Sequence, residues 1–507
     1  MAVTDFIVAI ELGSTRISGV AGKKNADGSI QILAYASEKS SGCIRKGTIF
    51  NLDKTTQLIS VVIGKLEERL NASIKKVYVG VGGKSVRSIR KQESKKLNED
   101  TRISQALIDE MMKSNKELPL IDQEILAIEP QEYKIGSSQL TTEPVGIATD
   151  RIEGNFLNII GRNTLRSSIK QCFRQAGEGY EIAECIVSAQ ALAQVVLTPG
   201  ERRSGCILVD LGAETTTVSV YRNNKLRHLA VIPLGGNNIT KDICSQKIDE
   251  EEAEQVKLTF GSAYTAPSDN PDDANKQLSL DGRVSIRAQL LEDIVEARIE
   301  EILENVKNQV VLSDYSEKLL SGAVLTGGGA NLANMEEAFK RIIKTDKVRT
   351  ALKPNVELDD PDNLIPLDGT HNTLIGLLDA GKENCCKKAD PNLQKQLEQL
   401  QREQEERHRK EEEAKEAQRL EEERKKQEKA KAEQCEALII ASRSHKGKKE
   451  YKAAISKLNA ALSLGVESKT EEIEELLSDI KKERSESKFW NRLLKNLSDS
   501  ADDIMKE

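Results

Sequence analysis

The sequence predicts an α/β protein of more than one domain that continues into a long, charged, helical C-terminal part. Up to about residue 390, short apolar runs typical of strands, such as FIVAIEL and GCILVDLG, alternate with helical periodicities such as TTQLISVVIGKLEERL. Beyond it, QLEQLQREQEERHRKEEEAKEAQRLEEERKKQEKAKAEQ has no glycine or proline and almost no apolar face. This pattern is typical of a solvated charged helix or a weak coiled coil. A chain of 507 residues has room for about two to four domains.

The composition argues against several classes of protein. The 75 Lys and Arg residues nearly balance the 82 Asp and Glu residues, and no basic block is interleaved with aromatic residues, so nucleic acid is not an expected partner. The N-terminus has no basic region followed by a long apolar run, and a cytoplasmic protein is expected. The eight cysteines form no CxxC pair and the four histidines are dispersed, which favours reduced thiols over a zinc site.

A strand, a polar turn and a second strand occur in the same order twice, in IVAIELGSTRISGV and in VDLGAETTTVSVY. Glycine and small hydroxyl residues expose backbone N–H groups to anionic oxygens, and a carboxylate at the strand end can face a hydrated Mg²⁺ that neutralises phosphates. The candidate phosphate-binding residues are Glu11, Gly13, Ser14 and Thr15 in the first copy and Asp210, Gly212, Thr215 and Thr216 in the second. Glu11 and Asp210 are the candidate Mg²⁺ ligands, either directly or through water.

A third glycine-rich element lies in SGAVLTGGGANL, where a strand ends in Gly327, Gly328 and Gly329. Residues without a side chain allow a flat base and its sugar to approach the backbone closely. Each of these turns alone is more often structural than functional. Their succession along one chain indicates a nucleotide site.

The three elements resemble the phosphate 1, phosphate 2 and adenosine motifs of the superfamily that contains actin, heat-shock chaperones and sugar kinases. Within it, the chain resembles the FtsA family of bacterial cell-division proteins over roughly residues 5–385. The blocks that carry this resemblance, in family order, are SGCIRKGTIFNLD, EPQEYKI with EPVGI, VLTPGERRSGCILVDLG, HLAVIPLGGNNITKDIC, AEQVKLTFGSA and HNTLIGLLDAGKEN.

The resemblance implies a two-lobed actin-like (ribonuclease H-like) fold with ATP and Mg²⁺ in the cleft and an inserted 1C-type subdomain. In AEQVK, Glu254 and Lys257 match the ribose contacts of the superfamily, although the residues alone fit an exposed salt-bridged helix face equally well. The expected parts are a first lobe at 1–84, 164–204 and 366–386, the insertion at 85–163, a second lobe (2A/2B-type) at 205–365, a charged arm at 387–434, a helical hairpin at 435–484 and an amphipathic helix at 485–507.

Two features depart from what an efficient ATPase needs. Glu214 stands where a backbone that approaches phosphate favours glycine, so its charge and bulk should weaken ATP binding unless Mg²⁺ or an outward rotamer relieves them. The segment IVSAQALAQVVL before the second phosphate motif offers Ser188, Gln190 and Gln194 to orient water, but no carboxylate. At most a slow ATPase is expected, and no catalytic residue is assigned.

The C-terminal segment SKFWNRLLKNLSDSADDIMKE combines the only tryptophan of the chain with a helically spaced apolar stripe and basic residues. Such a helix is suited to the interface of an anionic membrane, although docking on the preceding hairpin is an alternative. The resemblance favours the membrane. The candidate membrane-binding residues are Phe489, Trp490, Leu493, Leu494 and Leu497.

The resemblance therefore implies an ATP-binding cell-division protein on the cytoplasmic side of the cell membrane at the division site. Its expected partners are FtsZ, whose filaments it would anchor, other divisome proteins, further copies of itself in a polymer, and the membrane surface. Two alternatives from the superfamily are a sugar or small-metabolite kinase and a pilus- or chaperone-type actin relative. The first needs a base in a sugar pocket, and the second would lack the insertion at 85–163.

Overall fold

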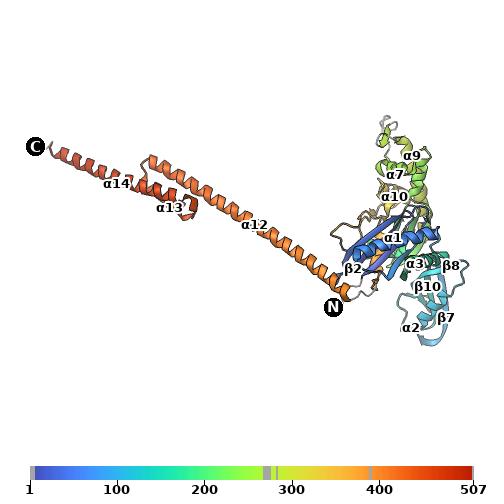
Figure 1. Cartoon of the computed structure of the whole chain (residues 1–507). Coiled ribbons are helices and arrows are strands. Elements are labelled where there is room, and N and C mark those ends of the chain that lie inside the picture. Colours follow the sequence, from blue (N-terminus) through green and yellow to red (C-terminus); the bar gives the residue numbers. More distant parts are fainter. Residues whose placement is uncertain are drawn as a thin grey trace. The chain divides into compact units, whose positions relative to one another are not determined.

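The computed structural model describes residues 6–177, 179–266, 276–280, 282, 284–386 and 391–504 (Figure 1). The side chains of residues 99, 100, 391–405, 408, 411, 413 and 494–504 are not among those described. The chain divides into two compact units, at 1–390 and 391–507. None of the described helices is both long and apolar enough to cross a membrane.

The first lobe is built on a six-stranded sheet in the order β11-β6-β1-β2-β3-β19. Strands β1, β2 and β3 form an antiparallel meander, and β6 and β11 extend it in parallel. Helices α1 and α3 pack together against this sheet, as do α11 and α4. The bounds are β1 Ile7–Leu12, β2 Arg16–Lys24, β3 Ile30–Lys39, β6 Lys76–Val81, β11 Glu181–Val187, β19 Leu358–Asp359, α1 Leu52–Leu70, α3 Thr164–Gln175, α4 Ser188–Val196 and α11 Asn372–Ala380.

Helix α1 illustrates how the sequence sets these elements. Its N-cap, Asn51, accepts a hydrogen bond from the Lys54 N–H at 2.9 Å, which satisfies one of the free amides of the first turn. Buried residues spaced three and four apart, including Ile59, Ile63 and Leu66, then form one apolar stripe facing the core.

The second lobe contributes five strands, β18-β17-β12-β13-β14, to a nine-stranded sheet. Strands β12, β13 and β14 repeat the antiparallel meander of the first lobe, and β17 runs parallel to β12. The bounds are β12 Cys206–Leu211, β13 Thr216–Arg222, β14 Lys225–Ile232, β17 Ala323–Thr326, β18 Val348–Thr350, β15 Gln277–Leu280, β16 Val284–Arg287, α5 Pro199–Ser204, α6 Gly236–Cys244, α7 Glu250–Phe260, α9 Ala288–Leu312, η1 Ser316–Lys318, η2 Gly328–Asn331 and α10 Met335–Ile343.

The insertion supplies the remaining four strands of that sheet, in the order β7-β10-β8-β9. It joins the second lobe where β7 pairs with β14 at Arg87 and Ala230. The buried Arg227 of β14 strengthens this junction, because its guanidinium donates to Glu132 of β8 at 2.9 Å. The bounds are β7 Arg87–Arg102, α2 Gln105–Lys116, β8 Gln123–Ile135, β9 Gln139–Thr141 and β10 Ala148–Arg162.

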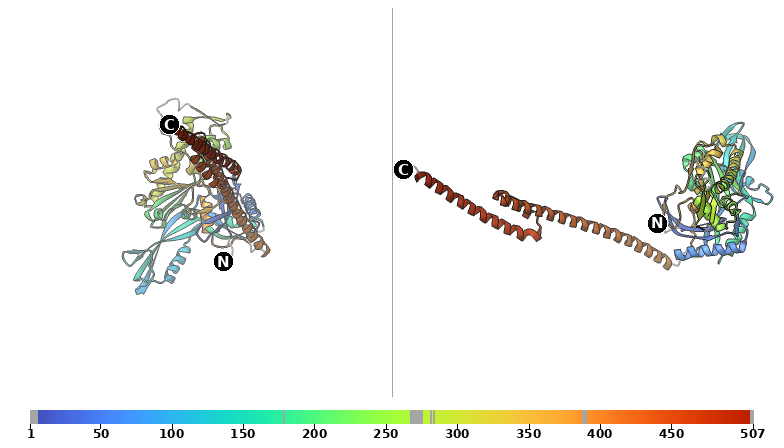
Figure 2. Two further views of the ribbon diagram at one scale, coloured as in Figure 1. Left: turned by 90° about the vertical axis from the view of Figure 1, so that its left-hand side faces the viewer. Right: turned by 90° about the horizontal axis from the view of Figure 1, so that it is seen from above.

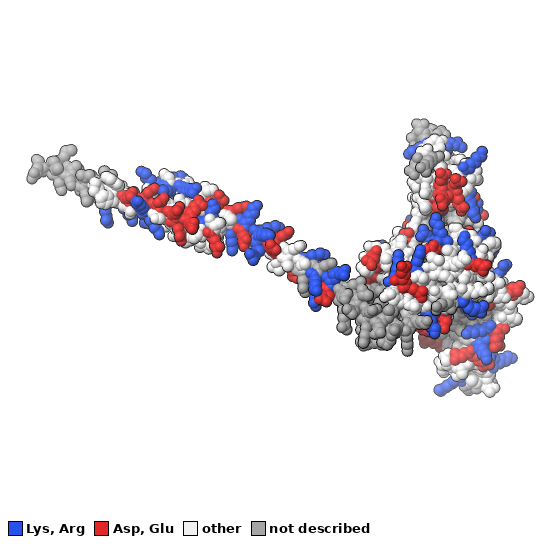
Figure 3. Space-filling view, in the orientation of Figure 1, with Lys and Arg blue, Asp and Glu red and all other residues white. Residues whose placement is uncertain are grey.

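The second unit consists of three helices: α12 (Pro391–Gly447), α13 (Tyr451–Ser463) and α14 (Glu467–Ile504). Helix α13 lies against the end of α12 and the start of α14 (Figure 2). Buried residues from all three, among them Ile439, Leu458 and Ile473, form a small separate core. Lysine, arginine, aspartate and glutamate side chains mix along the surface of this unit (Figure 3).

Helix α12 runs without a break from the charged arm into the segment expected to form a hairpin, and α14 continues from that segment into the amphipathic end. No glycine or proline stands between Pro391 and Gly447, so nothing in the sequence ends the helix at the change of composition.

Candidate functional site

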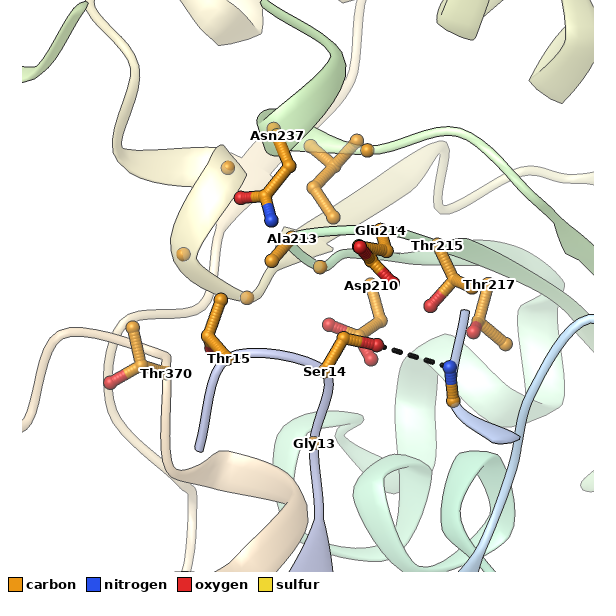
Figure 4. A pocket seen from close by; sticks show the side chains of 18 of the residues that line it. Gly13, Ser14, Thr15, Asp210, Ala213, Glu214, Thr215, Thr217, Asn237 and Thr370 are labelled. Carbon is orange, nitrogen blue, oxygen red and sulfur yellow. Dashed lines mark hydrogen bonds between the residues drawn. The ribbon is translucent and has the colours of Figure 1, made fainter. Parts of the chain in front are cut away.

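A cavity of about 720 Å³ lies between the two lobes. The ends of β1 and β12 and the turns that follow them form part of its wall (Figure 4), and the turn after β17 and helix α7 contribute further residues. All the predicted nucleotide-binding residues except Thr216 line it, namely Glu11, Gly13, Ser14, Thr15, Asp210, Gly212, Thr215, Glu254, Lys257, Gly327, Gly328 and Gly329.

The two polar turns have the same backbone geometry. The Gly13 N–H donates to the Arg16 carbonyl at 2.9 Å, and the Gly212 N–H donates to the Thr215 carbonyl at 2.9 Å. A Cβ added to either glycine would lie 2.8 Å from the carbonyl oxygen that it faces. Glycine is therefore needed in both turns to let the hairpin close.

Thr216 lies outside the cavity, in contrast to the prediction. Its side chain is fully buried and its hydroxyl donates to the Leu234 carbonyl at 2.9 Å. Thr217 lines the cavity in its place. Successive side chains of a strand point to opposite faces, so β13 can turn only one of these two threonines toward the cleft. Because three threonines are consecutive, at 215–217, the sequence does not show which of them face the cavity.

The two carboxylates at the strand ends lie in a cleft that disfavours their charged forms. Burial, and secondarily the charge of Asp210, raises the pKa of Glu11 to about 8. Burial raises the pKa of Asp210 to about 6. A pair of carboxyl groups with raised pKa values gains most from a nearby cation, because a cation compensates for the lost hydration of both.

The donor set fits Mg²⁺ that is shared with a ligand. Among the described residues, no three His, Cys, Asp or Glu side chains are arranged to hold a metal ion by themselves. Mg²⁺ commonly takes one or two carboxylates and completes its coordination with substrate phosphates and water. Glu11 and Asp210 supply that number of carboxylates beside two turns with exposed backbone.

The glycine turn after β17 lies directly beside Asp210, because β17 pairs in parallel with β12 and aligns Thr326 with Asp210. Gly327 has a φ of 84°, and a Cβ at this position would collide with the Asp210 carboxylate. Both the left-handed backbone and the close approach require glycine here. The third predicted motif is thereby placed next to the second.

Lys257 and Glu254 form a network with α6 rather than an exposed surface pair. The Lys257 ammonium is mostly buried and donates to Glu254 at 2.6 Å and to the Thr240 hydroxyl at 2.9 Å. It also donates to the carbonyl of Gly236 at 3.3 Å. Helix α7 thus presents this pair to the cavity with the side chains already held in place.

Comparisons with known proteins agree with this architecture. The profile of a family described as "Cell division protein FtsA" matches residues 207–369, and that of the "SHS2 domain inserted in FTSA" matches residues 83–160. The Cell division protein FtsA of Porphyromonas gingivalis is 30% identical over 405 residues, which is 77% of this chain and 81% of the relative. This chain belongs to the FtsA family.

A second member of the FtsA family, from Escherichia coli K12, is 26% identical over 395 residues, which is 75% of this chain and 90% of the relative. Among solved structures, the "PilM-PilN type IV pilus biogenesis complex" contains a similar chain, with a TM-score of 0.52, 15% identity and coverage of 73% of this chain and 97% of that chain. The predicted actin-like α/β fold with an FtsA-type insertion is confirmed. The SHS2 match covers the strands β7 to β10 of the insertion almost completely.

Of the three polar residues on α4 that could orient water, Ser188 alone lines the cavity. Gln190 donates to Glu129, and Gln194 accepts from Arg202 at 2.8 Å. Both amides are therefore held by partners other than cavity residues. A hydroxyl group is the polar side chain that α4 offers to the cleft.

Sequence reasoning missed the turn between the short strands β4 (Ile44–Arg45) and β5 (Thr48–Ile49). The Gly47 N–H of this turn donates to the Ser14 hydroxyl at 3.0 Å, as drawn in Figure 4, and the Lys46 N–H donates to the Glu214 carboxylate at 2.6 Å. The dipeptide Lys46–Gly47 is a turn signal, but nothing local connects it with the phosphate motifs.

The apolar residues at the start of the C-terminal stripe are exposed on α14. Phe489 and Trp490 are 62% and 60% exposed, and Leu493 is 38% exposed. The two rings pack edge to face with centroids 6.3 Å apart. Leu494 and Leu497 lie on the same helix, with side chains outside those described. Within the second unit, the three described side chains are therefore not docked on the helices before them.

Proposed function

We propose that this FtsA family member is an ATP-binding, actin-like cell-division protein that acts as a membrane-tethered adaptor. The observation that carries the proposal is the pair of matching glycine turns that face one cavity, together with the glycine turn at Gly327. The two phosphate turns would receive the polyphosphate, and the third turn would receive the adenosine. Glu254 and Lys257 would contact the ribose.

Mg²⁺, when bound with the nucleotide, would neutralise part of the phosphate charge. Glu11 and Asp210 would hold it, directly or through water. The Ser14 and Thr15 hydroxyls and the amides of the first turn would orient the phosphates from the other side. Because α4 presents Ser188 instead of a carboxylate, hydrolysis should be slow.

The adaptor role rests on family membership and on the exposed aromatic residues of α14. In this proposal the protein polymerises on the cytoplasmic face of the cell membrane at the division site, anchors FtsZ filaments and recruits other divisome proteins. Each large apolar side chain that enters the lipid interface would contribute up to roughly 1.5–3 kcal/mol. One helix of this kind attaches weakly, and a polymer would multiply the attachments.

Sedimentation with anionic liposomes tests this role. The full chain should sediment in a manner that depends on ATP and on protein concentration. W490E, or truncation before Lys488, should leave the protein in the supernatant while ATP binding persists. L420E is the matched control, since Leu420 is 62% exposed on α12 but lies outside the aromatic stripe. Sedimentation of the truncated protein would place the membrane contact elsewhere.

The kinase alternative makes a different prediction for the same cleft. A sugar or metabolite kinase would consume ATP rapidly when its second substrate is added. A screen of ATP consumption against common sugars therefore separates the two functions. ATP consumption that rises when a sugar is added would overturn the adaptor proposal. The same rate of ATP consumption with every sugar would support it.

A further inference from the structure

One hydrogen bond crosses the cleft at the phosphate end. Glu214 belongs to the turn between β12 and β13 in the second lobe, and Lys46 belongs to the turn between β4 and β5 in the first. The Glu214 carboxylate accepts from the Lys46 N–H at 2.6 Å. The side chain therefore does not leave the cleft for solvent, and instead reaches toward the first lobe next to Ser14 (Figure 4).

The turn that receives Glu214 is rigid and directs two successive amides at cleft residues. Lys46 and Gly47 both have positive φ values, of 50° and 67°. The Lys84 N–H donates to the Lys46 carbonyl at 3.0 Å, and a Cβ on Gly47 would lie 2.6 Å from the Gly83 Cα. This close packing fixes where the two amides point. One meets the Ser14 hydroxyl and the other meets the Glu214 carboxylate.

The Glu214 carboxylate therefore occupies a backbone amide next to the turns proposed to bind phosphate. It places a negative charge of the protein where a negatively charged ligand group would bind. Backbone amides of tight turns bind phosphate oxygens in the same way as they bind a carboxylate. Among the described residues, no three acidic side chains are arranged to hold a metal ion by themselves, and the hydrogen-bond partner of the Glu214 carboxylate is the Lys46 N–H.

We infer that Glu214 is a specificity-determining residue that makes the site discriminate against the terminal phosphate of ATP relative to ADP. The inference rests on the proposed nucleotide site. A third phosphate group placed beside Ser14 meets the charge of Glu214 and competes with it for the Lys46 amide. ADP has no group at that position and meets neither obstacle. Glu214 therefore weakens the binding of ATP and leaves the binding of ADP nearly unchanged.

Isothermal titration of the full chain with a non-hydrolysable ATP analogue and with ADP, both in excess Mg²⁺, tests this inference. E214Q removes the charge and E214A removes the whole side chain. Each should strengthen binding of the ATP analogue by about fivefold or more and leave ADP binding within about twofold, as expected for one screened charge near a polyanion. E317Q removes an exposed glutamate of the same lobe and should change neither affinity.

The outcomes separate the inference from the proposed function. Equal changes for both nucleotides, or unchanged binding of the ATP analogue, would overturn the inference and leave the nucleotide site in place. Weaker binding of the Mg²⁺ complex by E214Q would overturn it as well, because the carboxylate would then serve the metal. If the parent protein binds neither nucleotide, the proposed function itself falls, and the inference with it.

Discussion

The two hairpins of the cleft share their backbone and differ in their side chains. In both, a carboxylate is the residue before the last of the first strand, a glycine N–H closes the turn on a carbonyl at 2.9 Å, and the strands pair in the same register. At the second and third turn positions, however, the first hairpin has Ser14 and Thr15, whereas the second has Ala213 and Glu214. In the proposed site, the shared backbone would bind phosphate oxygens, and the different side chains would set how strongly each turn does so.

The two carboxylates also differ in their electrostatic surroundings. Burial is the main cause that raises the pKa of both: Glu11 reaches about 8, with the charge of Asp210 as a second cause, and Asp210 reaches about 6. The two hairpins therefore share their backbone geometry, but their carboxyl groups have different pKa values.

The largest effect is expected from D210A. It removes the carboxylate that lies beside both the second phosphate turn and Gly327, so MgATP binding should fall by about 100-fold or more, the upper range for groups that support a bound metal. Isothermal titration measures the loss. D346A, which removes an exposed aspartate of the same lobe, is the control. A D210A protein that binds as well as the parent would remove Asp210 from the site.

A matched pair, G13A and G212A, tests whether the two turns are equivalent. In each, the new Cβ would lie 2.8 Å from a backbone carbonyl oxygen, so each should lower the free energy of unfolding by about 1–3 kcal/mol. Urea unfolding gives the values. G64A is the control with the opposite sign, because Gly64 lies inside α1 with open space around it and alanine there should add about 0.5–1 kcal/mol. Unequal losses of stability would show that the two turns are not equivalent.

In the absence of nucleotide, E11Q is expected to differ from the parent protein in its free energy of unfolding, by an amount that depends on pH. The folded protein holds the Glu11 proton more tightly than the unfolded chain does, because the pKa rises from 4.5 to about 8 on folding. This contribution to stability is complete below 4.5 and is lost as the pH rises toward 8. Glutamine mimics the protonated form, so E11Q should be more stable than the parent by up to about 5 kcal/mol near pH 9, with a difference below about 1 kcal/mol near pH 5.

Urea unfolding at several pH values measures this difference. D210N provides the comparison, since the lower pKa of Asp210 shifts its window to between 3.8 and about 6. An E11Q advantage that does not grow with pH would mean that Glu11 is charged in the folded protein at neutral pH.

The smallest effect is expected from S14A. It removes the hydroxyl that accepts from the Gly47 N–H at 3.0 Å, which should cost about 0.5–1.5 kcal/mol of unfolding free energy. S41A, on an exposed serine of the same lobe, should stay within about 0.5 kcal/mol of the parent. If the two variants lose the same amount, the bond to the β4–β5 turn contributes nothing to stability.

The sequence predicts the site as far as local patterns reach. Carboxylate, glycine and small residues at fixed offsets after an apolar strand identify both hairpins and the turn at Gly327, because each is a local backbone requirement. The alternation of β13 decides between Thr216 and Thr217, and that register depends on pairing with β12. A run of three threonines does not reveal it.

Longer-range contacts escape the same reasoning. The hydrogen bond between Lys46 and Glu214 joins residues 168 positions apart, and the tertiary fold brings them together. The insertion is continuous with the sheet of the second lobe through a single aligned pair, Arg87 and Ala230, which leaves no periodic signal in the sequence. In the second unit, the composition of α12 changes from highly charged to more apolar, but the helix continues through this change. Both compositions favour a helix, so the sequence does not show whether the helix ends there.

The decisive measurement is a structure of the full chain with Mg²⁺ and a non-hydrolysable ATP analogue. It shows whether both hairpins bind the phosphates of one nucleotide. We expect the phosphates between the Gly13–Thr15 and Gly212–Thr215 turns, with the base beside Gly327–Gly329. A nucleotide bound elsewhere, or an empty cleft at a saturating concentration of the analogue, would contradict this expectation.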